Sequence, residues 1–176
     1  MANKQALREL QTRLADRLQL ARTQGVAASW LAVEAGEKKY LFPLSQAGEI
    51  FPWTAPQPVP YTRDWFVGVA NLRGGLFGVV DLAGLIGNGP KYVRTDMARA
   101  ESRLVALNGA LEVNCALWID RLWGLRNQSM FGDFAERASD APEYFGNSYV
   151  DFNGGTWQEI NLQRLAQQVD FLTIGT

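Results

Sequence analysis

Short apolar runs separated by turn residues follow one another from Ser29 to the end of the chain. Apolar and polar positions alternate most clearly in SWLAVEAG (29–36), KKYLFPL (38–44), SRLVALNG (102–109) and LEVNCALWID (111–120). Alternation with a period of two is the pattern of a strand that is buried on one face. Many such segments at near-regular spacing predict an all-β fold built from small barrels.

A longer pattern occurs twice, because residues 65–86 (WFVGVANLRGGLFGVVDLAGLI) have the same layout as residues 145–166. The matching positions are Gly74-Gly75 with Gly154-Gly155, Leu72 with Phe152, Phe77 with Trp157, Asp81 with Asn161 and Leu85 with Leu165. Glycine supplies the positive φ of a two-residue hairpin turn, and Asp or Asn is a favourable helix N-cap. Each copy therefore predicts strand, turn, strand and short helix. The repeat indicates two related halves, with the polar segment 87–101 as their seam.

Residues 3–24 carry a helical pattern, which Gly25 ends. Its apolar stripe consists of Leu7, Leu10, Leu14, Leu18 and Ala21. We therefore expect an amphipathic N-terminal helix in residues 1–25, followed by one β-domain in residues 26–176. The stripe either packs on the protein's own body or docks on a partner, and the sequence leaves both readings open.

Composition removes several classes of function. The 17 basic and 18 acidic residues give a net charge of -1, and no basic stripe indicates nucleic acid or a membrane surface. No signal peptide and no run of about 18 apolar residues is present, so we expect a cytoplasmic protein without direct membrane insertion. The single cysteine, Cys115, lies in an alternating segment and is expected to be a buried thiol. The absence of histidine excludes Ser-His-Asp and Cys-His nucleophiles and histidine-bearing zinc sites.

The segment Gly68-Val69-Ala70-Asn71-Leu72-Arg73-Gly74, followed by Val79-Val80-Asp81-Leu82, strongly resembles the CheW family of chemotaxis adaptors. The resemblance implies two small five-stranded, SH3-like β-barrels about a pseudo-two-fold axis, a short C-terminal helix, no cofactor and no catalytic activity. It also implies two partners, a methyl-accepting receptor and the regulatory domain of a CheA-type histidine kinase, met in receptor arrays at the inner face of the membrane. Trp65-Phe66 and the N-terminal helical pattern look most like the adaptors of the system that controls type IV pili and twitching motility.

The resemblance also carries individual residues. In the family, the arginine of the motif pairs with the glutamate of an E-I motif beside the receptor groove, and the corresponding residues here are Arg73 and Glu49. Leu44 and Ala47 stand at groove positions, and Asn71 joins the partner-binding set. The turn and cap residues are Gly68, Gly74 and Gly75, which we expect to set backbone geometry, and Asp81, which we expect to cap the helix after the hairpin.

A competing hypothesis is a PilZ-like module that binds cyclic di-GMP. Its elements are an R-x-x-x-R pair, Arg99 and Arg103, and a second group formed by Asn127, Ser129 and Gly132. Paired guanidinium groups suit phosphates and stack on guanine. An enzyme is a third class, but the aspartates are scattered singly between apolar segments, and nothing in their spacing brings two into one cleft.

Overall fold

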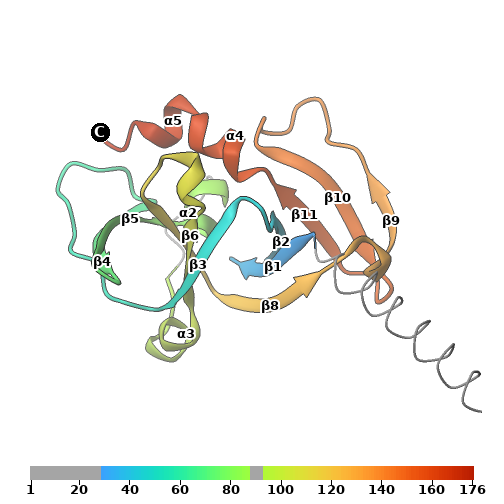
Figure 1. The fold of residues 1–176 in the computed structure, drawn as a ribbon, viewed down its shortest axis with the longest axis horizontal. Coiled ribbons are helices and arrows are strands. Elements are labelled where there is room, and N and C mark those ends of the chain that lie inside the picture. Colours follow the sequence, from blue (N-terminus) through green and yellow to red (C-terminus); the bar gives the residue numbers. More distant parts are fainter. Residues whose placement is uncertain (1–28, 88–92) are drawn as a thin grey trace, which may run out of the picture.

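The computed structural model describes residues 29–87 and 93–176; the predicted N-terminal helix and part of the predicted seam lie outside these ranges. The described chain consists of two sheets and a few short helices (Figure 1). The helices are α2 (Leu82–Gly87), α3 (Asp96–Glu101), α4 (Leu162–Gln167) and α5 (Val169–Leu172), with single 3-10 turns η1 (Gly109–Leu111) and η2 (Gln128–Met130). The all-β prediction is confirmed.

The six-stranded sheet has the order β8-β1-β2-β11-β10-β9. Its strands are β1 (Trp30–Ala35), β2 (Lys38–Pro43), β8 (Arg121–Arg126), β9 (Phe131–Ala135), β10 (Phe145–Asp151) and β11 (Thr156–Ile160). The five-stranded sheet has the order β3-β6-β7-β5-β4. Its strands are β3 (Ala47–Pro52), β4 (Phe66–Leu72), β5 (Gly75–Asp81), β6 (Arg103–Leu107) and β7 (Cys115–Ile119). Apart from the additional β9, the two orders correspond strand for strand.

Each sheet takes strands from both halves of the sequence. The hairpin β1-β2 joins the sheet that holds β10-β11, and the hairpin β6-β7 joins the sheet that holds β4-β5. The joining pairs, β2 with β11 and β5 with β7, are parallel, which requires long crossover connections. The chain passes between the sheets at residues 44–46 and at Asp120. The segment 87–101 connects two strands of the same sheet, so it is not the seam between two barrels that the repeat predicted.

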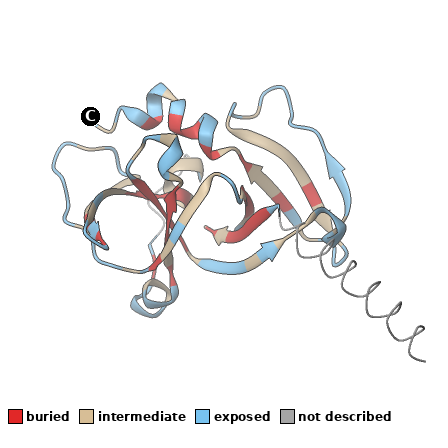
Figure 2. Cartoon of the chain, viewed as in Figure 1, coloured by how far each residue is buried: buried red, intermediate tan, exposed pale blue. Residues whose placement is uncertain are grey.

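Three clusters of buried side chains form the core, and the burial is concentrated on the strands (Figure 2). The central cluster draws on both sheets and includes Leu31, Val33, Phe42, Val80, Val105, Leu117, Ile119, Ile160 and Leu162. Each fully buried Leu, Ile or Phe contributes about 1.5–3 kcal/mol through removal of apolar surface from water. Cys115 belongs to this cluster, and burial raises the pKa of its thiol to about 12, as expected for a structural thiol.

The two Gly-Gly hairpins have different turns. In the first, Leu72 pairs with Gly75, so the turn residues are Arg73 and Gly74, with φ of 47° and 80°. Positive φ at both positions is typical of a type I′ turn, which lies one residue before the Gly74-Gly75 turn that the sequence repeat predicted. In the second, the amide of Gly154 donates to the carbonyl of Asp151 (3.0 Å) in a turn that is one residue longer. As a result Asp151, and not Phe152, corresponds to Leu72.

Candidate partner-binding site

Glu49 and Arg73 form the ion pair that the family resemblance implied. Arg73 Nη2 lies 2.7 Å from Glu49 Oε1, and the side chains are 77% and 40% exposed, respectively. An ion pair this exposed contributes only about 0–1 kcal/mol to folding. The pair therefore leaves two charged groups at the surface of the five-stranded sheet, where a partner has access to them.

Local backbone features bring the two side chains together. The pairing of β3 with β6 shifts register between Ala47 and Ile50, which places Glu49 in an irregular part of the strand. Gly48 fits there because a Cβ would lie 2.8 Å from the carbonyl oxygen of Leu107. Arg73 is held by the type I′ turn of the hairpin.

Asn71 takes part in the same turn. Its Oδ1 accepts a hydrogen bond from the amide of Gly74 (3.0 Å) while the residue remains exposed. Gly74 has φ of 80°, and a Cβ there would have open space, so backbone conformation is what selects glycine. At Gly68, with φ of 145°, a Cβ would overlap the carbonyl of Gln57. Gly68 and Gly74 therefore have the geometric role expected of them, whereas Gly75 is the first residue of β5, and Asn71 has a structural role beside its proposed one.

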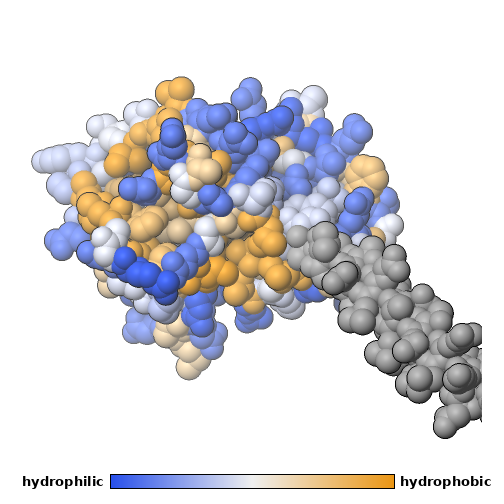
Figure 3. All heavy atoms as spheres, viewed as in Figure 1, coloured by the Kyte–Doolittle hydropathy of each residue, from blue (hydrophilic) through white to orange (hydrophobic). Residues whose placement is uncertain are grey.

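Apolar side chains gather on the face that presents β3 and β8 (Figure 3). Leu44, just before β3, is 39% exposed, and Ala47 is half-buried against the central core. On β8, Leu122 and Leu125 are exposed. The family resemblance placed Leu44 and Ala47 at groove positions and gave no role to the two leucines of β8. Leu122 and Leu125 are three residues apart, and the register shift of β8 against β1 places both opposite core residues of β1, which alternation in the sequence does not indicate.

A buried charge cluster lies where β5 and β7 end. Arg94 is buried; its Nη2 donates to Asp81 Oδ1 (2.9 Å), and its Nε donates to Asp120 Oδ1. The guanidinium carbon lies 3.8 Å from the ring centroid of Trp118. Burial acts to lower the pKa of Arg94, but the hydrogen bonds to the two carboxylates outweigh it and raise that pKa. Asp81 thus binds Arg94, a role that the helix-cap prediction did not foresee.

The chain passes from one sheet to the other at residues 44–46 and at Asp120, and each of these connections carries a side chain that binds to the other part of the fold. Asp120 Oδ2 accepts from the amide of Gly36 in the β1-β2 turn (2.6 Å), and Gln46 Oε1 accepts from the amide of Leu162 at the start of α4 (2.8 Å). Asn161 Oδ1 accepts from the amide of Arg164 (2.9 Å), so the predicted cap of α4 is confirmed. These contacts hold the two sheets, and with them the apolar face, in a fixed relation.

The residues of the cyclic di-GMP hypothesis are not arranged as one motif. Arg99 lies in α3 and Arg103 in β6 of the five-stranded sheet, whereas Asn127, Ser129 and Gly132 lie in the connection and strand that follow β8 in the six-stranded sheet. Arg103 Nη1 donates to the carbonyls of its neighbours at positions 101 and 102. Within residues 29–87 and 93–176, no group of three or more His, Cys, Asp or Glu side chains is placed to hold a metal ion.

Comparison with known proteins decides between these hypotheses. A family model described as the CheW-like domain matches residues 29–169. The chain belongs to this family. Its members are scaffold proteins, not enzymes, which excludes the catalytic hypothesis, and the match across both sheets overturns the PilZ-like one.

Two relatives support this assignment. Protein PilI of Pseudomonas aeruginosa is 26% identical over 106 residues, which cover 59% of this chain and 56% of PilI, so the match spans little more than half of that relative. The crystal structure of the scaffolding protein TtCheW from Thermoanaerobacter tengcongensis superposes with a TM-score of 0.62 at 16% identity, covering 83% of this chain and 96% of TtCheW. The second likeness concerns the fold. In the described part of the chain, no helix has the length and apolar character needed to cross a membrane.

Proposed function

We propose that this protein is a cytoplasmic adaptor that couples a methyl-accepting receptor to the regulatory domain of a CheA-type histidine kinase. Membership of the CheW-like family supports the adaptor role. The observation that carries the proposal is the exposed Glu49–Arg73 pair on a fold whose adjoining face is apolar. Charge at the edge and apolar surface beside it are the usual anatomy of a protein interface, with a polar rim around an apolar centre.

The same proposal extends to the pathway. The likeness to PilI supports a chemosensory system that controls type IV pili and twitching motility, with the adaptor recruited to receptor arrays at the inner face of the membrane. Leu44, Ala47 and Asn71 form the expected contact set together with the ion pair. The exposed leucines of β8 would extend it across the same face.

A clean deletion tests the adaptor role. Without this protein, the kinase should keep its intrinsic autophosphorylation but lose its response to receptor stimulation, because no component joins the two. The measurement is kinase phosphorylation in membranes reconstituted with receptor, kinase and either wild-type protein or none. Normal receptor control in the absence of the protein would contradict the proposal.

Motility assays separate the two pathways. The deletion strain should lose directed twitching on a surface and keep normal swimming, and reintroduction of the gene should restore twitching. Loss of swimming with normal twitching would keep the adaptor role and reject the assignment to type IV pili.

A further inference from the structure

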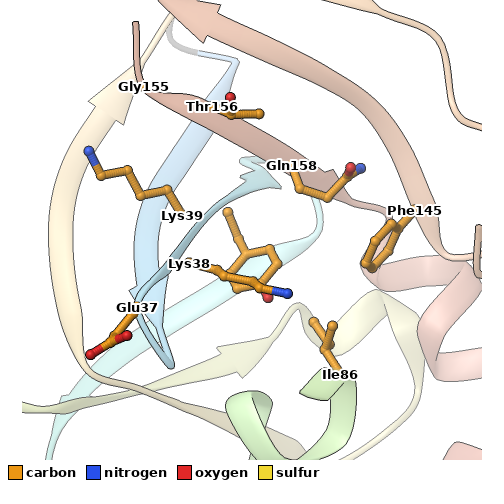
Figure 4. Close-up of a pocket in the computed structure, with 9 residues that line it drawn as sticks. Glu37, Lys38, Lys39, Ile86, Phe145, Gly155, Thr156 and Gln158 are labelled. Atoms are coloured by element: carbon orange, nitrogen blue, oxygen red, sulfur yellow. The ribbon is translucent and has the colours of Figure 1, made fainter. Parts of the chain in front are cut away.

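A pocket of about 470 Å³ lies away from the Glu49–Arg73 pair, between the parallel strands β2 and β11 and the end of α2. Its lining includes Lys38, Tyr40, Ile86, Phe145 and Gln158 (Figure 4). A cavity of this size with apolar walls and a few polar groups is typical of a preformed binding site.

The position of Lys38 indicates the charge of the occupant. In Figure 4 its side chain extends across the pocket toward Ile86, whereas the carboxylate of Glu37 points away. Within the described residues, no carboxylate forms an ion pair with Lys38. Lys38 is exposed in the free protein, so a ligand that covers the pocket would remove water from its ammonium group. A carboxylate that enters beside an apolar group offsets that loss.

The corresponding place in the other half of the molecule shows what kind of molecule fits. Phe66 corresponds to Phe145, because Phe66 pairs with Val80 of β5 and Phe145 pairs with Ile160, the equivalent residue of β11. There, the chain itself supplies apolar side chains: Phe171 of α5 stacks on Trp65 with ring centroids 6.0 Å apart, and Leu111 and Val113 of the β6-β7 connection pack on the central core. The β1-β2 connection is only a tight turn at residues 36–37, and it leaves the pocket open.

We propose that the pocket binds a polypeptide segment of a partner protein in which an apolar side chain stands beside a carboxylate. The apolar side chain would lie against Ile86 and Phe145, and the carboxylate would pair with Lys38. Residues 1–28 contain five basic and two acidic residues, so their net charge does not complement Lys38. The site is distinct from the face on which the proposed adaptor function rests.

Three capped tripeptides test the proposal on the full-length protein: phenylalanine between two glutamates, phenylalanine between two lysines, and alanine between two glutamates. The measurement is peptide titration followed by backbone amide NMR shifts. We expect the glutamate–phenylalanine peptide to shift the amides of Gly155 and Gln158 and to bind at least about tenfold more tightly than either control, a difference of about 1.4 kcal/mol.

Charge reversal identifies the group responsible. Lys38→Glu should invert the preference, so that the lysine–phenylalanine peptide binds more tightly, and Arg137→Glu on another surface should leave it unchanged. Lys38 is exposed, so the variant should fold, which far-UV circular dichroism checks. Equal binding of all three peptides, absence of binding, shifts away from this pocket, or an unchanged preference in Lys38→Glu would each overturn the proposal.

Discussion

The two sheets share one strand plan but differ at one edge. In the six-stranded sheet, β10 pairs with β9 over several residues, whereas in the five-stranded sheet the equivalent strand β4 meets only an isolated bridge between Val69 and Gln57. The segment around Gln57 contains Pro52, Pro56, Pro58 and Pro60. Proline cannot donate to a strand ladder, so this segment lies against the edge without becoming a strand. The prolines thus account for the difference between the two sheets at this edge.

The sheets also differ in how their clusters are filled. Besides the central cluster, each sheet has a buried cluster of its own. The cluster of the six-stranded sheet contains Trp30 and Trp157, whereas that of the five-stranded sheet has Leu104 and Phe77 at the corresponding positions. A second contrast concerns polarity: at the start of α4, backbone amides donate to the neutral side chains of Asn161 and Gln46, but α2 begins beside the buried Arg94 cluster. The packing is thus similar in the two sheets, but the contact at the start of α2 is charged and the contact at the start of α4 is neutral.

The largest expected effect on stability distinguishes the charged contact at α2 from the neutral contact at α4. Arg94→Met should lower the free energy of unfolding by about 4 kcal/mol, because the buried Asp81 and the partly buried Asp120 would lose their cation. The melting temperature should fall by about 10 °C for a chain of this size. Gln46→Leu, the matched change at the start of α4, should lower the free energy of unfolding by about 1 kcal/mol. Equal losses in the two variants, measured by chemical denaturation, would show that the charged cluster contributes no more to stability than the neutral hydrogen bond.

A second prediction concerns the proline segment. Gly68→Ala should lower stability by about 3 kcal/mol, because φ of 145° is unfavourable for alanine and its Cβ would overlap the carbonyl of Gln57. The corresponding residue of the other sheet is Asn147, which already carries a side chain. Asn147→Ala should therefore cost less than about 1 kcal/mol in the same denaturation assay. A well-tolerated Gly68→Ala would mean that the segment moves aside.

A third prediction concerns the turn of the β10-β11 hairpin. Asp151 accepts hydrogen bonds from the Trp157 indole and from the amides of Gly155 and Asn153, and these lower the pKa of its carboxyl below the ordinary 3.8. Asp151→Ala should lower stability by about 1.5 kcal/mol at pH 7.

The lowered pKa also sets the pH dependence of this loss. A lowered folded-state pKa gives stabilisation that is present above the unfolded-state value and is lost as the pH falls through the folded-state value. Unfolding curves of both proteins at pH 7 and pH 2.5 should therefore converge in acid. A constant difference would show that the carboxylate's charge plays no part.

The sequence predicted the strands and short helices well, because strand alternation and most capping depend on neighbouring residues, although the first turn lies at Arg73-Gly74 and Asp81 binds Arg94. The strand–turn–strand–helix copies are present in the structure, as is the Asn161 cap. The Glu49–Arg73 pair joins two strands and was expected only from the family resemblance. The exchange of hairpins between the sheets was not predicted, because it depends on parallel pairings between distant segments. Arg94 was missed for the same reason: nothing near it in sequence identifies the two carboxylates that bind it.

The smallest expected effect on folding concerns the ion pair on the proposed interface. Arg73→Ala should change the melting temperature by no more than a few degrees, because an exposed pair contributes less than about 1 kcal/mol. It should nevertheless weaken binding to the receptor or the kinase regulatory domain about tenfold, or about 1.4 kcal/mol. Asn153→Ala, in the other hairpin turn, is the matched control and should leave binding unchanged.

Exchange of the two charges then separates the ways in which the pair could act. If the partner recognises the arginine itself, the double variant Glu49→Arg with Arg73→Glu should keep the melting temperature and still bind weakly, because the pair reforms in the opposite orientation. If the pair acts only by fixing the β3 edge beside the apolar face, the double variant should recover most of the affinity. We expect the first result, since a pair this exposed has little hold on the backbone. Early melting of Arg73→Ala with normal binding once folded would show that Arg73 is structural and that the interface lies elsewhere.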